Sequence, residues 1–123
     1  MDRFEEFTVD GKSLLYADLS GLSTHEDIIE GFKQLNLMVT KYPANSLCLI
    51  SNIKDVKFDS KIKKVAEEFT ILNGPHVKYD IIIGTDGIRR MLASSLMKIA
   101  GRKNFHFCFS KEEAIDWMLK QKN

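Results

Sequence analysis

Two short segments of the chain combine carboxylate, hydroxyl and glycine residues in patterns that could hold a phosphate. The first runs from Asp55 to Ser60 and precedes an amphipathic run of residues. A hydroxyl in the first turn of a helix lies near free backbone N–H groups and the positive end of the helix dipole. Ser60 is therefore a candidate to hold a phosphate, either bound or covalently attached. The alternative is that Asp59 or Ser60 simply caps the helix.

The second segment is Gly84-Thr85-Asp86-Gly87, at a predicted turn between a strand and a helix. Two glycines at such a turn allow a ligand to approach the backbone closely. The spacing differs from G-x-G-x-x-G, and the Lys-Ser/Thr pair of a P-loop is missing. Asp86 also places a negative charge where an anion would bind. The pattern therefore favours a capped turn over a nucleotide site.

No arrangement of catalytic or metal-binding residues stands out in the sequence. The histidines, His25, His76 and His106, are paired neither with a nucleophile nor with one another at ligand spacing. Cys48 and Cys108 each lie inside an apolar run, which is typical of buried free thiols in a reducing compartment. We therefore expect a cytoplasmic protein with no enzymatic activity, no metal and no cofactor.

The composition is that of an ordinary globular chain. The sequence has 123 residues, of which 44% are hydrophobic and 28% charged, with 2 prolines and 7 glycines. This length fits a single domain over residues 1–123, and the composition excludes disordered and collagen-like classes. No apolar run approaches the ~20 residues of a membrane span. The first residues also lack the pattern of a signal peptide.

The charges nearly cancel but are unevenly distributed. Residues 1–30 carry a net charge of −6 and residues 31–123 a net charge of +7, for a total of +1. Four cations are expected on two successive helices: Lys61, Lys64, Arg89 and Arg90. With Met97 beside Arg90 on the helical wheel, this face suits an acidic protein or, weakly, an anionic membrane surface. A solvated face is the alternative, and the small net charge argues against nucleic acid.

The hydrophobic pattern predicts an α/β domain. Asp10-Gly11 between two strand-like runs predicts a hairpin with a type I′ turn, so the first two strands are antiparallel. The strands are expected at Phe4–Val9, Lys12–Leu19, Ser46–Ile53, Val77–Gly84 and Phe105–Phe109. The order ββαβαβαβα then gives a mixed five-stranded sheet in which the later strands are parallel, packed by four helices. Ligands of such sheets bind at the carboxyl ends of the strands.

The four helices have recognisable ends and apolar faces. Ser23 with Glu26, and Ser110 with Glu113, predict capping boxes for the first and last helices. Pro43, Asn73-Gly74-Pro75 and Gly101 are expected to end the first three helices. The inward face of the second helix is predicted as Ile62, Val65, Ala66, Phe69 and Leu72. That of the third is predicted as Ile88, Leu92, Ser95, Leu96 and Ile99.

A hairpin, a helix and a buried strand, followed by a turn that places Phe58-Asp59-Ser60 at a helix start, resemble the STAS domains. These are the SpoIIAA-like anti-sigma-factor antagonists and the related sulfate-transporter domains. In that family the turn usually reads Asp-Ser-Ser/Thr-Gly, and a partner kinase phosphorylates a hydroxyl there. Here Lys61 and Ile62 follow Ser60. We therefore expect Ser60 to cap the helix and not to be a kinase substrate.

A closer likeness is to small stand-alone bacterial proteins grouped as STAS/SEC14-like. The segments that carry it are Asp18–Ser23, Tyr42–Leu47, Gly101-Arg102 and Glu112–Trp117. The resemblance implies the SpoIIAA-like fold and, through the name of the group, contact with lipid or membrane. It favours a non-enzymatic regulatory or protein-interaction module with an unknown protein partner, and leaves a homodimer open. The alternative is a binder of a small anionic or lipid-like ligand at the carboxyl ends of the strands.

Overall fold

A computed structural model describes residues 3–121 of the chain and has the predicted order ββαβαβαβα. The strands are β1 (Phe4–Val9), β2 (Lys12–Asp18), β3 (Leu47–Asn52), β4 (Val77–Ile83) and β5 (Phe105–Phe107). The helices are α1 (His25–Val39), α2 (Ser60–Asn73), α3 (Gly87–Ile99) and α4 (Lys111–Leu119), with a 3₁₀ turn at Gly74–His76. The predicted mixed five-stranded sheet is therefore confirmed.

The hairpin at the start of the sheet has the predicted turn. Asp10 and Gly11 have φ angles of 50° and 77°, the positive values that a type I′ turn requires. Val9 pairs with Lys12 across this turn, so β1 and β2 are antiparallel. The pairs β2–β3, β3–β4 and β4–β5 are all parallel.

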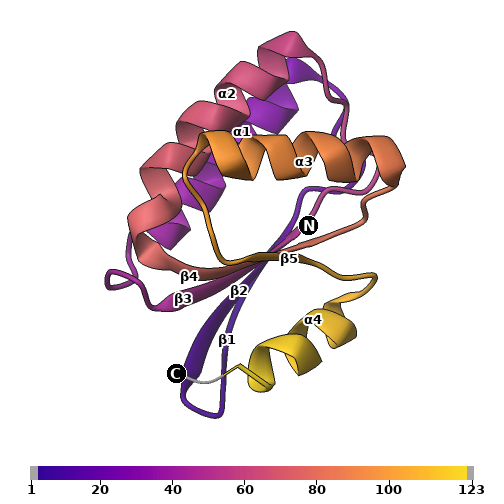
Figure 1. The fold of residues 1–123 in the computed structure, drawn as a ribbon. Helices are drawn as coiled ribbons and strands as arrows, with labels where there is room; N and C mark the ends of the chain where they lie inside the picture. Colours follow the sequence, from indigo (N-terminus) through magenta and orange to yellow (C-terminus); the bar gives the residue numbers. More distant parts are fainter. Residues whose placement is uncertain (1–2, 122–123) are drawn as a thin grey trace.

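The strands lie in the sheet in the same order as in the sequence. Each crossover therefore steps in the same direction, and crossovers of one hand place their helices on one face. Figure 1 shows α1, α2 and α3 together on one side of the sheet and α4 on the other. The alternation of strand side chains divides the core accordingly. Leu14 packs on the α4 side with Met118, and Leu15 packs on the other side with Leu35.

The predicted start of α1 and one bond of the capping box predicted for α4 need correction. Thr24, and not Ser23, caps α1, because its backbone is extended and its hydroxyl accepts the Asp27 N–H at 3.1 Å. Ser110 caps α4 as predicted and accepts the Glu113 N–H. The Glu113 carboxylate accepts the N–H of Phe109, one residue before the expected donor.

The predicted inward faces of α2 and α3 are partly wrong. Leu72, Ile88 and Ile99 are 65%, 69% and 54% exposed. The buried face of α3 is formed by Ala93 and Leu96. The small residue Ala93 faces the sheet, and the larger Ile88 and Ile99 therefore face outward.

A buried ion pair ties the sheet to the helices on the α1–α3 face. Arg102 donates from Nε to Asp80 Oδ2 at 2.8 Å and from Nη2 to Asp80 Oδ1 at 2.6 Å, and both side chains are 7% exposed. Its Nη1 donates to the Thr70 carbonyl oxygen and to Asn73 Oδ1. Asn73 in turn donates to Asn36 Oδ1 of α1 at 2.9 Å. One guanidinium therefore links β4, α2 and, through Asn73, α1.

Replacing Arg102 by Ala is expected to lower the free energy of unfolding by about 3–5 kcal/mol, because it leaves the Asp80 carboxylate buried without its counter-charge. The double variant Arg102→Met/Asp80→Leu removes both charges and is expected to lose less than Arg102→Ala alone. Urea denaturation of the two variants measures the difference. A double variant as unstable as the single one would contradict this account of the pair.

Candidate functional site

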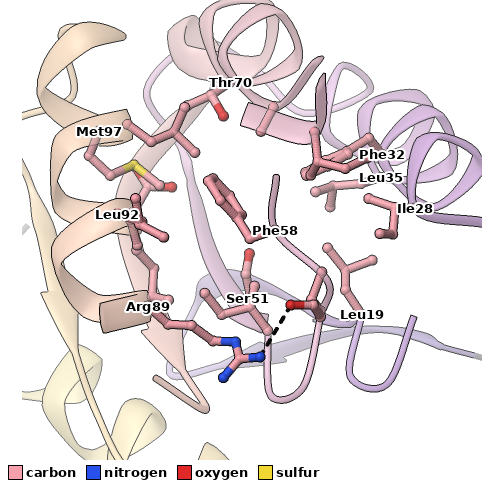
Figure 2. A pocket seen from close by; sticks show the side chains of 18 of the residues that line it. Leu19, Ile28, Phe32, Leu35, Ser51, Phe58, Thr70, Arg89, Leu92 and Met97 are labelled. Carbon is pink, nitrogen blue, oxygen red and sulfur yellow. Dashed lines mark hydrogen bonds between the residues drawn. The ribbon is translucent and has the colours of Figure 1, made fainter. Parts of the chain in front are cut away.

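A cavity of about 90 Å³ lies between the sheet and the three helices on one face. Its walls are mainly apolar and come from every neighbouring element. The side chains include Phe32 and Leu35 from α1, Ala66 from α2, and Leu92 and Leu96 from α3. Figure 2 shows Phe32 and Leu35 on one side of a common space and Leu92 on the other. Mostly apolar pockets with few polar groups are the usual form of small-molecule sites.

The cavity begins at the carboxyl ends of the strands. Leu19, Ile53 and Arg89 line this end. Open α/β sheets bind their ligands at this edge. The ring of Phe58, on the loop between β3 and α2, lies inside the space between the α1 and α3 side chains (Figure 2). Phe58 therefore occupies part of the room that a ligand would use.

The cavity extends back to the buried ion pair. Thr70, Asn73, Asp80 and Arg102 all belong to its lining. Burial raises the pKa of the Asp80 carboxyl, and the charge and hydrogen bonds of Arg102 oppose that rise. Because Arg102 is engaged by Asp80, Thr70 and Asn73, this end is polar but already satisfied.

Arg89 is the charged residue at the strand-end side of the cavity. Its Nη1 lies 2.8 Å from Asp86 Oδ2, and its Nη2 reaches the Val56 carbonyl oxygen only at 3.5 Å, the contact dashed in Figure 2. Its Nε is buried and has no hydrogen-bond partner, the only such side-chain nitrogen or oxygen in residues 3–121. Hydrogen bonds from Arg89, chiefly from its backbone N–H, hold the pKa of Asp86 below its ordinary value.

A second polar pair joins the starts of α1 and α2. His25 Nε2 lies 2.6 Å from Asp59 Oδ2, while Asp59 Oδ1 accepts the N–H of Ile62 at 2.9 Å. The His25 hydrogen bond and then the Ile62 N–H hold the pKa of Asp59 below its ordinary value. The pair fastens the residue next to Phe58 to the first helix.

The structure separates the roles of the first predicted segment. Asp59 is the N-cap of α2, so the prediction that Ser60 caps this helix is wrong. Ser60 is the first helical residue and is exposed. Asp55 lies in an exposed turn with a φ of 59°. Of this segment only Val56 and Phe58 line the cavity.

The second predicted segment forms a capped turn. Asp86 is the N-cap of α3, and Gly87 begins the helix next to open space. Gly84 has a φ of 79°, and a Cβ there would lie 2.6 Å from Asn52 Oδ1. This glycine therefore serves close packing against the end of β3. Thr85 is half-buried, and its hydroxyl accepts a long hydrogen bond from the Arg90 guanidinium.

The predicted basic residues point in different directions. Lys61 and Lys64 are exposed on α2, whereas the Arg90 guanidinium lies 5.0 Å from the centre of the Phe107 ring. Arg89 and Met97 line the cavity. The prediction that Met97 adds an apolar contact to an outer basic face is therefore wrong.

The remaining chemical groups lie away from this cavity or apart from one another. Cys48 and Cys108 are free and buried on the α4 face, and burial raises the pKa of Cys48 to about 12. Within residues 3–121 no group of three or more His, Cys, Asp or Glu side chains is placed to hold a metal ion. No helix in the same range has the length and apolar character needed to cross a bilayer.

Comparison with known proteins identifies the fold. No family model matches the sequence, and no curated protein matches it. The structure is similar to the crystal structure of an uncharacterized protein from the DUF3478 family, with a SpoIIAA-like fold, from Shewanella loihica PV-4. The TM-score is 0.70 at 16% sequence identity, over 93% of this chain and 90% of that one. The predicted SpoIIAA-like fold is therefore confirmed.

Replacing His25 by Ala is expected to raise the pKa of Asp59 toward its ordinary value of 3.8, because the His25 hydrogen bond is the main cause of its lowering. A lowered folded pKa adds stability above the unfolded value, and this stability is lost as the pH falls through the folded pKa. The variant should therefore lose less stability than the wild type on acidification below about pH 4.

Carboxyl NMR titration measures the Asp59 pKa directly, and urea denaturation at several pH values measures the stability. Asp86 is the internal control, because its lowered pKa comes from Arg89 and should not change. An Asp59 pKa that is the same in the variant and the wild type would contradict the assigned role of His25.

Proposed function

We propose that the protein is a non-enzymatic binding module that holds a small, mainly apolar ligand between its sheet and helices α1–α3. The observation that carries this proposal is the apolar cavity that begins at the strand ends and contains the Phe58 ring. Apart from Ser51, the polar residues of its lining lie at the two ends, Arg89 at one and Thr70, Asn73, Asp80 and Arg102 at the other. This combination of apolar walls and sparse polar groups supports binding by burial, with orientation set by the polar ends.

The size of the cavity favours a short ligand. Its volume of about 90 Å³ is below the ~150 Å³ of an engineered apolar cavity that binds benzene. It is well below the ~300 Å³ at which sites for drug-sized ligands begin. A ligand of six carbons therefore also needs the room of the Phe58 ring, which belongs to the loop between β3 and α2 and is half-buried.

The proposal of a non-enzymatic module is supported by how the reactive side chains are used. His25 is hydrogen-bonded to Asp59, and Asp59 also caps α2, so both side chains are engaged in structural hydrogen bonds. The Cys48 thiol is protonated at neutral pH, since burial raises its pKa to about 12, and it lies on the α4 face. Neither group faces the cavity.

Replacing Ala93 by Leu is expected to weaken binding of 1-hexanol by tenfold or more, because Ala93 lines the cavity and the larger side chain fills it. Overpacking is expected to cost about 1–3 kcal/mol of stability. The matched control is Ser95→Leu, which adds the same side chain on the opposite side of α3, about 200° away at 100° per residue. NMR titration of the amide signals measures both affinities.

If the amide signals of the wild-type chain do not respond to 1-hexanol, the proposed function is contradicted. A folded Ala93→Leu chain that binds 1-hexanol as tightly as Ser95→Leu does would also contradict it.

A second candidate function is a regulatory protein-interaction module, favoured by the outer face of α3. Ile88, Met91 and Ile99 are 69%, 66% and 54% exposed there. Exposed apolar rows rimmed by polar residues are typical of interaction sites. The exposed cations nearby are Lys98 on the same helix and Lys61 and Lys64 on neighbouring α2. The partner this face suits is a protein with an apolar groove and an acidic rim.

Replacing Met91 by Glu is expected to abolish capture of one acidic protein from a native lysate. The new carboxylate would face the apolar groove of the partner and the like charges of its acidic rim. The control is Ile71→Glu, at a residue of α2 that is 54% exposed. Proteins that both variants still capture would contradict the interaction face. Binding of the chain to anionic vesicles would favour a membrane surface instead, and a dimer lost in Met91→Glu would favour a second copy.

A further inference from the structure

The unpaired donor of Arg89 is unusual for a buried group. The large majority of buried side-chain polar atoms in proteins have a hydrogen-bond partner. In residues 3–121 the buried side-chain atom without one is Arg89 Nε, and Arg89 lines the strand-end side of the cavity. This unpaired donor marks the part of the cavity where a ligand atom can accept a hydrogen bond.

The guanidinium of Arg89 is used on one edge only. Its Nη1 is held by Asp86 Oδ2 at 2.8 Å. The other edge consists of Nε and Nη2, whose one hydrogen-bond partner within residues 3–121 is the Val56 carbonyl oxygen, 3.5 Å from Nη2. That distance is beyond the usual range of an N–H···O hydrogen bond. This edge therefore has two donors that the protein does not use, and a ligand can take both once the packing that buries Nε opens.

The other arginine of the cavity shows what this edge binds. Arg102 uses its own Nε and Nη2 to hold the two oxygens of Asp80, at 2.8 Å and 2.6 Å. This side-on fork is the geometry in which arginine recognises a carboxylate. The two ends of the cavity thus carry the same chemical edge, and a protein carboxylate occupies one of them.

The charges of the lining also favour an anion. The charged residues that line the cavity are Asp80, Arg89 and Arg102. Asp80 and Arg102 neutralise each other, which leaves the positive charge of Arg89. Its counter-ion Asp86 is 61% exposed and lies outside the lining, so solvent screens much of that pair. A single negative charge on a ligand would balance the cavity.

We infer that the ligand is a small monocarboxylate, with its apolar body in the cavity and its carboxylate on the Nε/Nη2 edge of Arg89. This inference rests on the proposed function, since it names the class of ligand for the same cavity. A planar group with two oxygens fits the fork, and its single charge matches the net charge of the lining. Asp86 then limits the affinity, because its carboxylate competes for the same guanidinium.

The test compares hexanoate with 1-hexanol, which share an apolar body and differ in charge, by NMR titration at neutral pH. The wild type is expected to bind hexanoate about tenfold or more tightly than 1-hexanol, the gain of a hydrogen-bonded charge. Arg89→Met is expected to remove this preference and keep the affinity for 1-hexanol. The matched control Arg90→Met, whose guanidinium lies over Phe107, is expected to keep the preference.

A further variant separates the two carboxylates that would share Arg89. Asp86→Asn removes the competing charge and keeps a side chain that caps helices well. Its affinity for hexanoate is expected to rise several-fold, with no change for 1-hexanol. An unchanged affinity for hexanoate would contradict the competition.

The outcomes distinguish the inference from the function on which it rests. Equal affinities of the wild type for the two probes would overturn the inference that the ligand is a carboxylate, and would leave the proposed apolar site intact. A preference for hexanoate that survives in Arg89→Met would place the anion elsewhere and also overturn it. Failure of the wild type to bind 1-hexanol would overturn the proposed function itself.

Discussion

The paired burial of Asp80 and Arg102 constrains the whole α1–α3 face of the sheet. A carboxylate in the middle of β4 faces the helical layer, and an unpaired charge there would cost several kcal/mol. The segment between α3 and β5 must therefore bring Arg102 back under the helices. Once there, the guanidinium also satisfies the Thr70 carbonyl oxygen and Asn73 near the end of α2. The polar network thus sets how closely the helices approach the sheet.

This constraint explains why an apolar layer contains a cavity. Protein interiors are usually packed as densely as organic crystals, and empty apolar space costs stability. Here the helices cannot settle further without breaking hydrogen bonds of Arg102 and Asn73 at one end. At the other end the His25–Asp59 pair holds the loop that carries Phe58. The space between these two fixed ends is filled only in part, by the Phe58 ring.

Local chemistry made much of the fold predictable, while packing between elements did not. Asp10-Gly11 specifies its turn through backbone conformation alone, and Ser110 specifies a helix start. Ser23 and Thr24 are adjacent hydroxyls, so the pattern could not choose the cap. The apolar spacing of α3 predicts that Ile88 is buried, but the residue is exposed, because the rotation of a helix follows the layer beneath it. The cavity escaped prediction because its lining has the composition of a packed core.

The two adjacent arginines of α3 show why charge density alone does not locate an anion site. The sequence pattern predicts one basic surface that includes Arg89 and Arg90, yet successive residues of a helix point about 100° apart. Arg90 lies against Phe107 and Thr85, and Arg89 enters the cavity, where its Nε has no partner. The exposed lysines of α2 carry the same charge but remain hydrated, so an anion gains little from them. What distinguishes Arg89 is a desolvated donor whose hydrogen bond the protein itself does not supply.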